Sequence, residues 1–179
     1  MKLYIIRHGL TDWNKLKKIQ GQTDIELNET GKNQALEAKK IFNEHDFDLI
    51  ICSPLKRTKL TAEIINQDKK VKTIYSDALL ERGLGLLEGQ PTNMEVDSLY
   101  DLKLNTSENN VELATDFRDR VFNLLDEVKE KYFDKKVLLV THGGTARAIE
   151  AYFYGINEDK VLPPETLKNC EIREYTFNN

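Results

Sequence analysis

The stretch Lys2-Leu3-Tyr4-Ile5-Ile6-Arg7-His8-Gly9 decides the fold class, because an apolar strand in it runs straight into a polar loop. Its continuous apolar run is typical of a strand that is covered on both faces. Arg7 and His8 follow at the point where that strand ends. In open α/β sheets, ligand sites lie at the carboxyl ends of the strands. A guanidinium and an imidazole are therefore expected at such a site.

A second histidine stands in the same setting later in the chain. His142 follows the apolar run 137–140 and precedes Gly143-Gly144. Only three histidines occur in the 179 residues, and two of them end predicted strands. This placement predicts that His8 and His142 share one site.

Strand patterns alternate with helix patterns along the rest of the chain. This alternation predicts a three-layer α/β/α sandwich with a mostly parallel central sheet. The last helix is expected to end at about Gly155. The expected strands span 2–7, 49–52, 71–75, 137–140 and 170–177.

Capping residues and apolar stripes mark where the predicted helices begin and what they bury. Asn28 is expected to cap one helix, and Ser53, followed by Pro54, is expected to cap the next. The residues expected on buried helix faces are Ala35, Ala38, Ile41 and Phe42, then Leu55, Thr58, Ala62 and Ile65, and finally Phe117, Val121, Leu124, Leu125, Val128 and Tyr132.

Length and composition fit one globular domain over residues 1–179, with 40% hydrophobic and 31% charged residues. The glycine-rich stretch 81–89 suits an irregular loop. Residues around 90–111 are polar and weakly periodic, although 94–102 could form a short helix. We expect this segment to be a small cap insertion over the site.

Composition also limits the partners. No apolar stretch approaches the roughly 20 residues of a membrane span, and the N-terminus lacks the apolar core of a signal peptide, which predicts a cytoplasmic protein with no membrane partner. The net charge is −4 and the lysines are spread between acids, so no nucleic acid partner is expected. Cys52 and Cys170 lie in apolar segments without paired metal spacing and are expected to be buried, reduced thiols. No cofactor is expected, and the oligomeric state stays open.

The side chains at the strand ends fit the needs of attack on a phosphate monoester, which takes a nucleophile, cations that hold charged oxygens, and an acid for the leaving group. A neutral imidazole is a competent nucleophile near pH 7, because its unperturbed pKa is roughly 6.5. His8 is therefore the candidate to carry the phosphoryl group. Arg7 and Arg57 are expected to converge above the sheet and to bind phosphate oxygens bidentately.

Two further groups complete this chemistry. The run His142-Gly143-Gly144 opens a helix whose amides and dipole favour an anion, and His142 is expected to donate to a phosphate oxygen. Glu81, beside the end of the third strand, is the best carboxyl for protonating the leaving group. The same carboxylate would afterwards deprotonate the attacking water.

Five motif blocks, in order, span almost the whole chain. The first, R-H-G-x-T-x-x-N, is matched by residues 7–14. The later blocks are matched by Gln20-Gly21, Asp24, Leu27, Glu29, Gly31 and Gln34-Ala35, by Ser53-Pro54-Leu55, Arg57 and Thr61-Ala62, by Glu81, Gly85 and Glu88-Gly89, and by His142-Gly143-Gly144. In these blocks the chain resembles the histidine phosphatase superfamily, the phosphoglycerate-mutase-like branch in particular.

The resemblance implies roles that agree with the chemical interpretation. It implies that His8 is the phosphorylated nucleophile and that Glu81 is the proton donor. It implies that Arg7, Arg57 and His142 hold the phosphate.

The resemblance also extends to two less certain positions. Asn14 matches a further phosphate or substrate contact, although a turn or cap role fits it equally well. Thr23 lies in the loop that usually borders the substrate. The departures from the motifs, which remove no group from this chemistry, are Leu10, Glu26, Asn28 and Leu87.

Three rival chemistries fit the sequence less well. The glycines at 83, 85 and 89 are spaced one residue too far apart for a dinucleotide loop. Only four residues separate Cys52 from Arg57, whereas cysteine-based phosphatases use C-x5-R. Neither His8 nor His142 has the neighbours that a catalytic metal requires, so no metal is expected.

Within the resemblance, the choice lies between a phosphatase and a mutase. The segment between Gly89 and Val111 holds one basic residue, Lys103, and this weakly charged cap favours a hydrolase of small phosphorylated metabolites. A phosphate-binding module without catalysis would commonly lack His8 or Glu81, and both are present.

Several residues around the expected site have no catalytic role in this interpretation. Met94, Tyr100 and Lys103 are candidates for substrate contacts. Arg82 is interpreted as a charge at the surface or the substrate rim, and Glu88 as a residue that holds the loop.

Overall fold

The computed structural model describes residues 1–42, 46–92, 99–102, 107–156, 162–163 and 167–177, and within them it shows a five-stranded sheet in the order β3-β2-β4-β1-β5. Three of the four strand pairs are parallel, and β5 runs antiparallel to β1. The predicted, mostly parallel sheet is therefore confirmed. The strands are β1 (Lys2–Arg7), β2 (Leu49–Cys52), β3 (Lys72–Tyr75), β4 (Val137–Thr141) and β5 (Ile172–Thr176).

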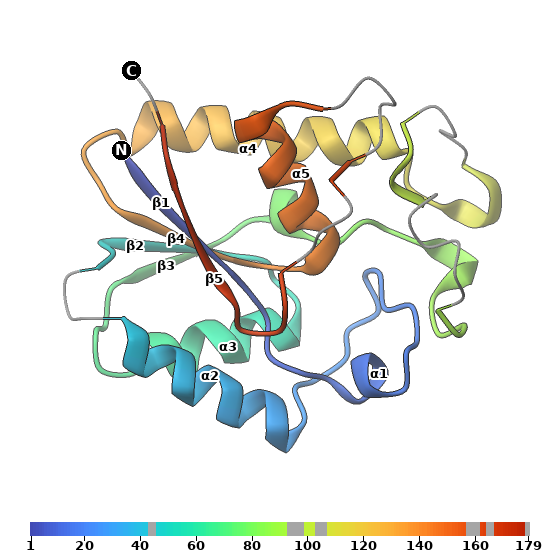
Figure 1. Cartoon of the computed structure of the whole chain (residues 1–179), viewed down its shortest axis with the longest axis horizontal. Coiled ribbons are helices and arrows are strands. Elements are labelled where there is room, and N and C mark those ends of the chain that lie inside the picture. Colours follow the sequence, from blue (N-terminus) through green and yellow to red (C-terminus); the bar gives the residue numbers. More distant parts are fainter. Residues whose placement is uncertain (43–45, 93–98, 103–106, 157–161, 164–166, 178–179) are drawn as a thin grey trace.

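Helices cover both faces of the sheet. In Figure 1, α2 and α3 lie on one side of the strands and α4 and α5 lie on the other. This arrangement confirms the predicted three layers. The helices are α1 (Asp12–Lys15), α2 (Glu29–Ile41), α3 (Lys56–Asn66), α4 (Ala114–Lys131) and α5 (Gly143–Tyr154), with short 3-10 helices at Asp77–Leu79, Gly85–Leu87 and Glu108–Asn110.

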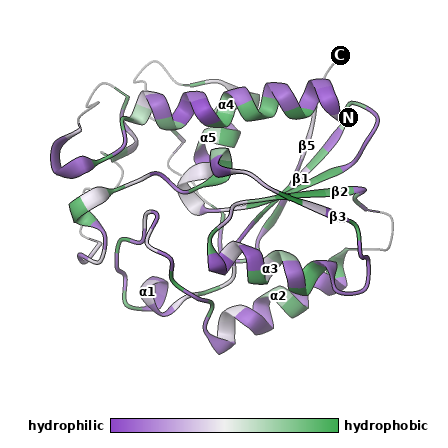
Figure 2. Ribbon diagram, turned by 180° about the vertical axis from the view of Figure 1, so that it is seen from behind, coloured by the Kyte–Doolittle hydropathy of each residue, from purple (hydrophilic) through white to green (hydrophobic). Residues whose placement is uncertain are grey.

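The alternation of side chains along β1 divides the core into two parts. Leu3 and Ile5 pack with the residues of α4 and α5, whereas Ile6 packs with those of α2 and α3. In Figure 2 the central strands are largely green, and the helices on either side alternate between green and purple. The central strands β1, β2 and β4 are thus largely buried, as their apolar sequences predicted, whereas β3 and β5 at the sheet edges are partly exposed. None of the described helices combines the length and the apolar character that a membrane span needs.

The start of α2 is as predicted, but its end is not. The side chain of Asn28 accepts a hydrogen bond from the N–H of Gly31 at 2.9 Å. Ile41, which was expected on the buried face, is 66% exposed, whereas Phe42 is buried. The reason is that the helix ends at Ile41 and Phe42 has extended backbone angles. The chain therefore turns there, and Phe42 joins the core without helical spacing.

The start of α3 corrects the prediction that Ser53 is a cap. The helix begins at Lys56, and the N-terminal flanking residue is Leu55, which is only partly buried. The N–H of Lys56 donates instead to the carboxylate of Asp24 at 2.7 Å. A side chain from a distant loop thus satisfies this helix end, and the hydroxyl of Ser53 is used in the site.

Two predicted strands are shorter than expected. Val71 lies outside β3, because Asn66 at the end of α3 binds its N–H and its carbonyl, each at 2.9 Å. The last strand begins at Ile172 and not at Cys170, whose φ of 58° breaks the extended conformation.

The expected cap and the single-domain boundaries stay predictions. Residues 93–98 and 103–106 lie outside the described residues, and with them Met94, Lys103 and most of the short helix expected over 94–102. Tyr100 is described and is buried against the ring of Phe117, with a centroid distance of 6.3 Å.

The strand ends meet at one edge of the sheet. Arg7 at the end of β1 pairs in register with Thr141 at the end of β4, and Cys52 at the end of β2 pairs with Val140. The residues that follow these strands therefore lie side by side.

The core between the sheet and α2 should contribute strongly to stability. Phe47 is 1% exposed and packs edge-on against Phe42, so Phe47→Ala should lower the free energy of unfolding by about 3–5 kcal/mol. The control is Phe133→Ala, at a ring that is 73% exposed, which should change it by less than about 0.5 kcal/mol. Urea unfolding measures both, and equal effects would contradict this assignment of the core.

Candidate active site

A cavity of about 280 Å³ lies at the carboxyl edge of the sheet. Two predicted residues that do not line it, His142 and Thr23, are bound to Arg57, which does. The structure therefore brings all the predicted site residues together. The predicted residues that line the cavity are Arg7, His8, Asn14, Arg57, Glu81 and Gly143.

The hydrogen bond that His8 makes decides which of its ring nitrogens can react. Nδ1 lies 2.8 Å from the carbonyl oxygen of Gly9, which can only accept, so Nδ1 holds the proton of the neutral ring and Nε2 keeps its lone pair. Burial, and then the charges of Arg57 and Arg7, lower the pKa of His8 well below its usual value. At neutral pH the ring is thus uncharged and nucleophilic at Nε2. The carbonyl of His8 accepts from Nδ2 of Asn169 at 2.9 Å.

His142 is held by protein groups at both ring nitrogens. Nε of Arg57 can only donate, so Nδ1 of His142, at 3.2 Å, accepts. Nε2 then carries the proton and donates to the hydroxyl of Ser53 at 2.8 Å. Burial and then the charge of Arg57 lower the pKa of His142 well below its usual value. Donation to a phosphate oxygen stays a prediction, and it requires His142 to exchange one of these partners.

Arg57 joins His142 to the loop that borders the cavity. The guanidinium is fully buried and donates from Nη1 to the carbonyl of Thr23 at 2.8 Å and from Nη2 to that of Gly21 at 2.7 Å. Burial lowers the pKa of Arg57 to about 10, so it remains positively charged at neutral pH. Thr23 contributes its carbonyl here, and its contact with substrate stays a prediction.

Glu88 holds this loop from the other side, as its sequence interpretation suggested. Its carboxylate accepts from the N–H groups of Gln22 at 2.9 Å, Thr23 at 2.8 Å and Leu84 at 3.0 Å. Gly21 has a φ of +49°, and a Cβ there would lie 2.1 Å from the Glu88 carboxylate. The loop can therefore approach Glu88 only because residue 21 is glycine.

Arg7 supplies a cation with an unused donor. Nη1 donates to the carbonyl of Leu167 at 2.8 Å. Across the described ranges, Nε of Arg7 and Nη1 of Arg82 are the only buried side-chain N or O atoms without a hydrogen-bond partner. An unpaired buried donor costs about 1–3 kcal/mol, and Arg7 lines the cavity. An anion bound there would satisfy it.

Glu81 occupies part of the helix N-terminus that was expected to receive an anion. One carboxylate oxygen accepts from the N–H of Gly144 at 2.9 Å, and the other accepts from the N–H of Arg82 at 3.0 Å. A Cβ at Gly144 would lie 2.4 Å from this carboxylate and 2.2 Å from the hydroxyl of Tyr100. Glycine at this position thus lets the carboxylate reach the end of α5 inside the cavity.

Asn14 has the cap role that was one of its two interpretations. It forms a capping box with Thr11 at the start of α1, in which each residue's side chain accepts from the backbone N–H of the other. Asn14 also lines the cavity, and its contact with substrate stays a prediction.

Sequence reasoning missed two cations that line the cavity, Arg147 and Lys18, and misplaced Arg82, which lies outside it. Arg147 lines the cavity and lies 4.7 Å from the ring centre of Tyr100. Its position one helical turn after Gly143 could have revealed it. Arg82 is 2% exposed and binds the carbonyl of Glu112, so its assignment to the surface is wrong. Within the described residues, no three or more His, Cys, Asp or Glu side chains gather in a way that could hold a metal ion.

Comparisons with known proteins show the family and the fold of this chain. Residues 3–179 match the family described as the histidine phosphatase superfamily (branch 1). The chain is 40% identical over 177 residues to "Uncharacterized phosphatase PhoE" of Bacillus subtilis (strain 168), covering 97% of this chain and 86% of that protein. It is 33% identical over 190 residues to "Probable phosphoglycerate mutase GpmB" of Escherichia coli O1:K1 / APEC, covering 99% and 85%. A solved structure of phosphoserine phosphatase from Entamoeba histolytica, in complex with 3-phosphoglyceric acid, is 27% identical and superposes with a TM-score of 0.79 over 98% of this chain and 90% of that one.

The two buried histidines should make stability depend on pH. Unfolding returns each ring to its usual pKa of about 6.5, so below that pH the unfolded chain binds more protons and the free energy of unfolding falls. Each histidine contributes a slope of up to about 1.4 kcal/mol per pH unit until the pH reaches its folded pKa. His142→Gln should remove one such contribution, which urea unfolding at a series of pH values below about 6.5 measures. Equal slopes in the variant and the wild type would show that His142 is protonated in the folded protein.

Proposed function

The chain belongs to branch 1 of the histidine phosphatase superfamily, and on this premise we propose that it hydrolyses small phosphomonoesters through a phosphohistidine intermediate on His8. One observation carries the proposal: Nδ1 of His8 is committed to the carbonyl of Gly9, which leaves the lone pair of Nε2 free, and His8 lines the cavity together with Arg7 and Arg57. An uncharged nucleophile between two cations suits a phosphate dianion.

In the first step, Nε2 of His8 attacks phosphorus. A P–N bond forms, the P–O bond to the leaving group breaks, and protonated Glu81 donates its proton to the departing alkoxide. Arg7 and Arg57 hold the charged oxygens during transfer, when charge on them is redistributed. The products of this step are an alcohol and the phosphohistidine.

In the second step, water attacks the phosphohistidine. Glu81, now ionised, accepts a proton from the water as the new P–O bond forms. The P–N bond breaks, and its electron pair returns to Nε2, so that neutral His8 and inorganic phosphate result. The cycle needs one carboxyl group that changes role between the steps, and no metal or cofactor takes part.

We favour hydrolysis over phosphoryl transfer between substrate positions. The "phosphatase" names of the Bacillus subtilis relative and the Entamoeba histolytica structure support this choice, while the "probable phosphoglycerate mutase" name of the Escherichia coli relative keeps the mutase as the second candidate. The size of the cavity suits a small phosphorylated metabolite. A release assay on phosphoserine, phosphoglycerate and sugar phosphates, run beside a mutase assay, distinguishes the two activities.

His8→Ala should abolish turnover and labelling. With a chelator present, the wild type should hydrolyse an aryl phosphate and, when quenched during turnover of a ³²P-labelled ester, carry an acid-labile phosphoryl group. Cys52→Ser is the control, because burial raises the pKa of that thiol to about 12 and leaves it unreactive. Full activity of His8→Ala, or loss of activity in chelator, would overturn the mechanism.

Glu81→Gln should lower the rate by roughly 10²- to 10⁴-fold for esters with poor leaving groups and by much less for nitrophenyl phosphates. The amide keeps the shape of the carboxyl but cannot donate a proton to the leaving group. Measuring kcat/KM over a series of alkyl and aryl phosphates gives the dependence on leaving-group pKa. A uniform loss across the series would argue against the acid role.

A further inference from the structure

We propose that Arg120, on α4 outside the cavity, is a positioning residue that holds the loop of Glu81 where its carboxyl can reach the leaving group. This inference rests on the proton-donor role proposed for Glu81. Arg120 does not line the cavity, so it acts on the reaction indirectly, through the loop that it binds and, more weakly, through its charge, which contributes to lowering the pKa of His142.

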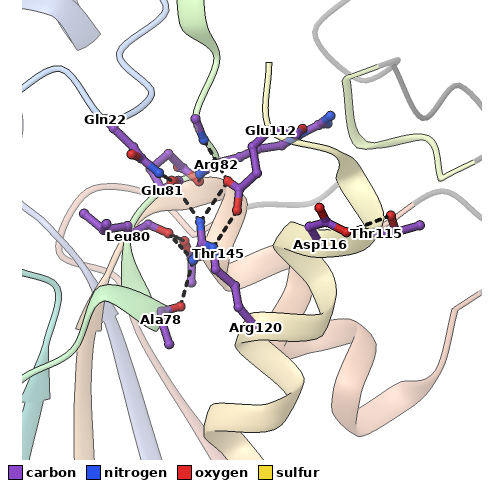
Figure 3. Close-up of polar contacts among 11 residues, drawn as sticks. Gln22, Ala78, Leu80, Glu81, Arg82, Glu112, Thr115, Asp116, Arg120 and Thr145 are labelled. Carbon is purple, nitrogen blue, oxygen red and sulfur yellow. Dashed lines mark hydrogen bonds and ion pairs between the residues drawn. The ribbon is translucent and has the colours of Figure 1, made fainter. Parts of the chain in front are cut away.

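The guanidinium of Arg120 uses all five of its N–H donors (Figure 3). Nη1 donates to the carbonyls of Ala78 at 2.8 Å and Leu80 at 2.9 Å. Nη2 donates to the carbonyl of Glu81 at 3.1 Å and to the carboxylate of Glu112 at 3.0 Å, and Nε donates to the same carboxylate at 2.7 Å. One side chain thus binds three carbonyls within four residues of the loop that carries the acid.

Glu112 binds the residues of the same loop that follow Glu81 in the sequence. Besides its two contacts with Arg120, its carboxylate accepts from the N–H of Gly83 at 2.9 Å, and its carbonyl accepts from Nε of Arg82 at 2.8 Å. The Arg120–Glu112 pair therefore binds residues on both sides of Glu81. Its side chains are 23% and 21% exposed, which shields the pair from water in part.

Glu81 is also bound by residues that lie on the side of the cavity. Nε2 of Gln22 donates to the carbonyl of Glu81 at 3.0 Å, so this carbonyl is shared between Gln22 and Arg120. The Glu81 carboxylate reaches the N–H of Gly144 in α5. With its backbone bound on two sides, Glu81 can adjust only through its own side-chain torsions.

This degree of fixation matters because proton transfer tolerates little displacement. The acid must lie within hydrogen-bond reach of the leaving oxygen, and a shift of about 1 Å can cost about 10²-fold in rate. Lysine cannot substitute, since an ammonium offers three donors in place of the planar fork of five. The five acceptors around Arg120 therefore specify arginine.

The test measures kcat/KM of Arg120→Met and Arg120→Lys over the alkyl and aryl phosphate series. Both variants should lose about 10²-fold on alkyl phosphates and change little on activated nitrophenyl phosphates, which need no acid. The matched control is Arg118→Met, on the same helix, whose side chain pairs with Asp119 at 2.6 Å. A loss of equal size on every ester would mean that Arg120 has only a structural role and would overturn the inference.

A double-mutant cycle identifies the residue through which Arg120 acts. In a Glu81→Gln background, Arg120→Met should cause no further loss on alkyl phosphates, because the group that it positions no longer donates. A full, multiplicative loss would overturn the inference. If Arg120→Met fails to fold, Glu112→Gln, which keeps the shape of the partner and removes its charge, should show the same leaving-group pattern at a smaller size, and a uniform effect there would also overturn it.

The same data separate this inference from the proposed function. A Glu81→Gln variant without leaving-group dependence would remove the acid role itself. A Glu81→Gln variant with that dependence, beside Arg120 variants without it, would remove only the positioning role.

Discussion

The buried guanidinium of Arg57 is the constraint on which the rest of the site depends. Its three hydrogen bonds go to neutral acceptors, the ring of His142 and the carbonyls of Thr23 and Gly21. A buried charge is costly, and the charges of Glu81, Asp24 and Glu88 offset it only in part, so the three contacts must all be maintained. They set the tautomer of His142, and through it the contact with Ser53, and they fix the conformation of the loop at Gly21. An anionic substrate in the cavity would add a further opposite charge beside this guanidinium.

The central strands β1, β2 and β4 could be predicted from the sequence because each is largely buried and reads as a nearly continuous apolar run. The bounds of β1 and β2 are as expected. The start of α3 could not be predicted, since the group that satisfies it, Asp24, is far away in the sequence. The exposure of Ile41 was missed for a related reason: periodicity extends a stripe without showing where the helix stops.

The site was predictable where side chains follow strands directly, as His8 and His142 do, and where motif residues reinforced that placement. Residues that lie on one structural element and bind the backbone of another could not be predicted. Arg147 sits on the inner face of a helix, and Arg82 and Arg120 bind carbonyls that carry no signature in the sequence. A charged residue in a polar segment is expected to be solvated, and only the fold shows that such an arginine is surrounded by backbone acceptors.

The antiparallel strand β5 makes the site depend on distant parts of the chain. Because β5 runs against β1, the segment before it lies at the same edge as His8, where Leu167 binds Arg7, Asn169 binds the carbonyl of His8, and the N–H of Cys170 binds the carbonyl of Arg7 at 3.0 Å. The contacts of Arg7 and His8 thus come from residues that lie 160 and 161 positions further along the chain, so the N-terminal part of the fold cannot form the site alone.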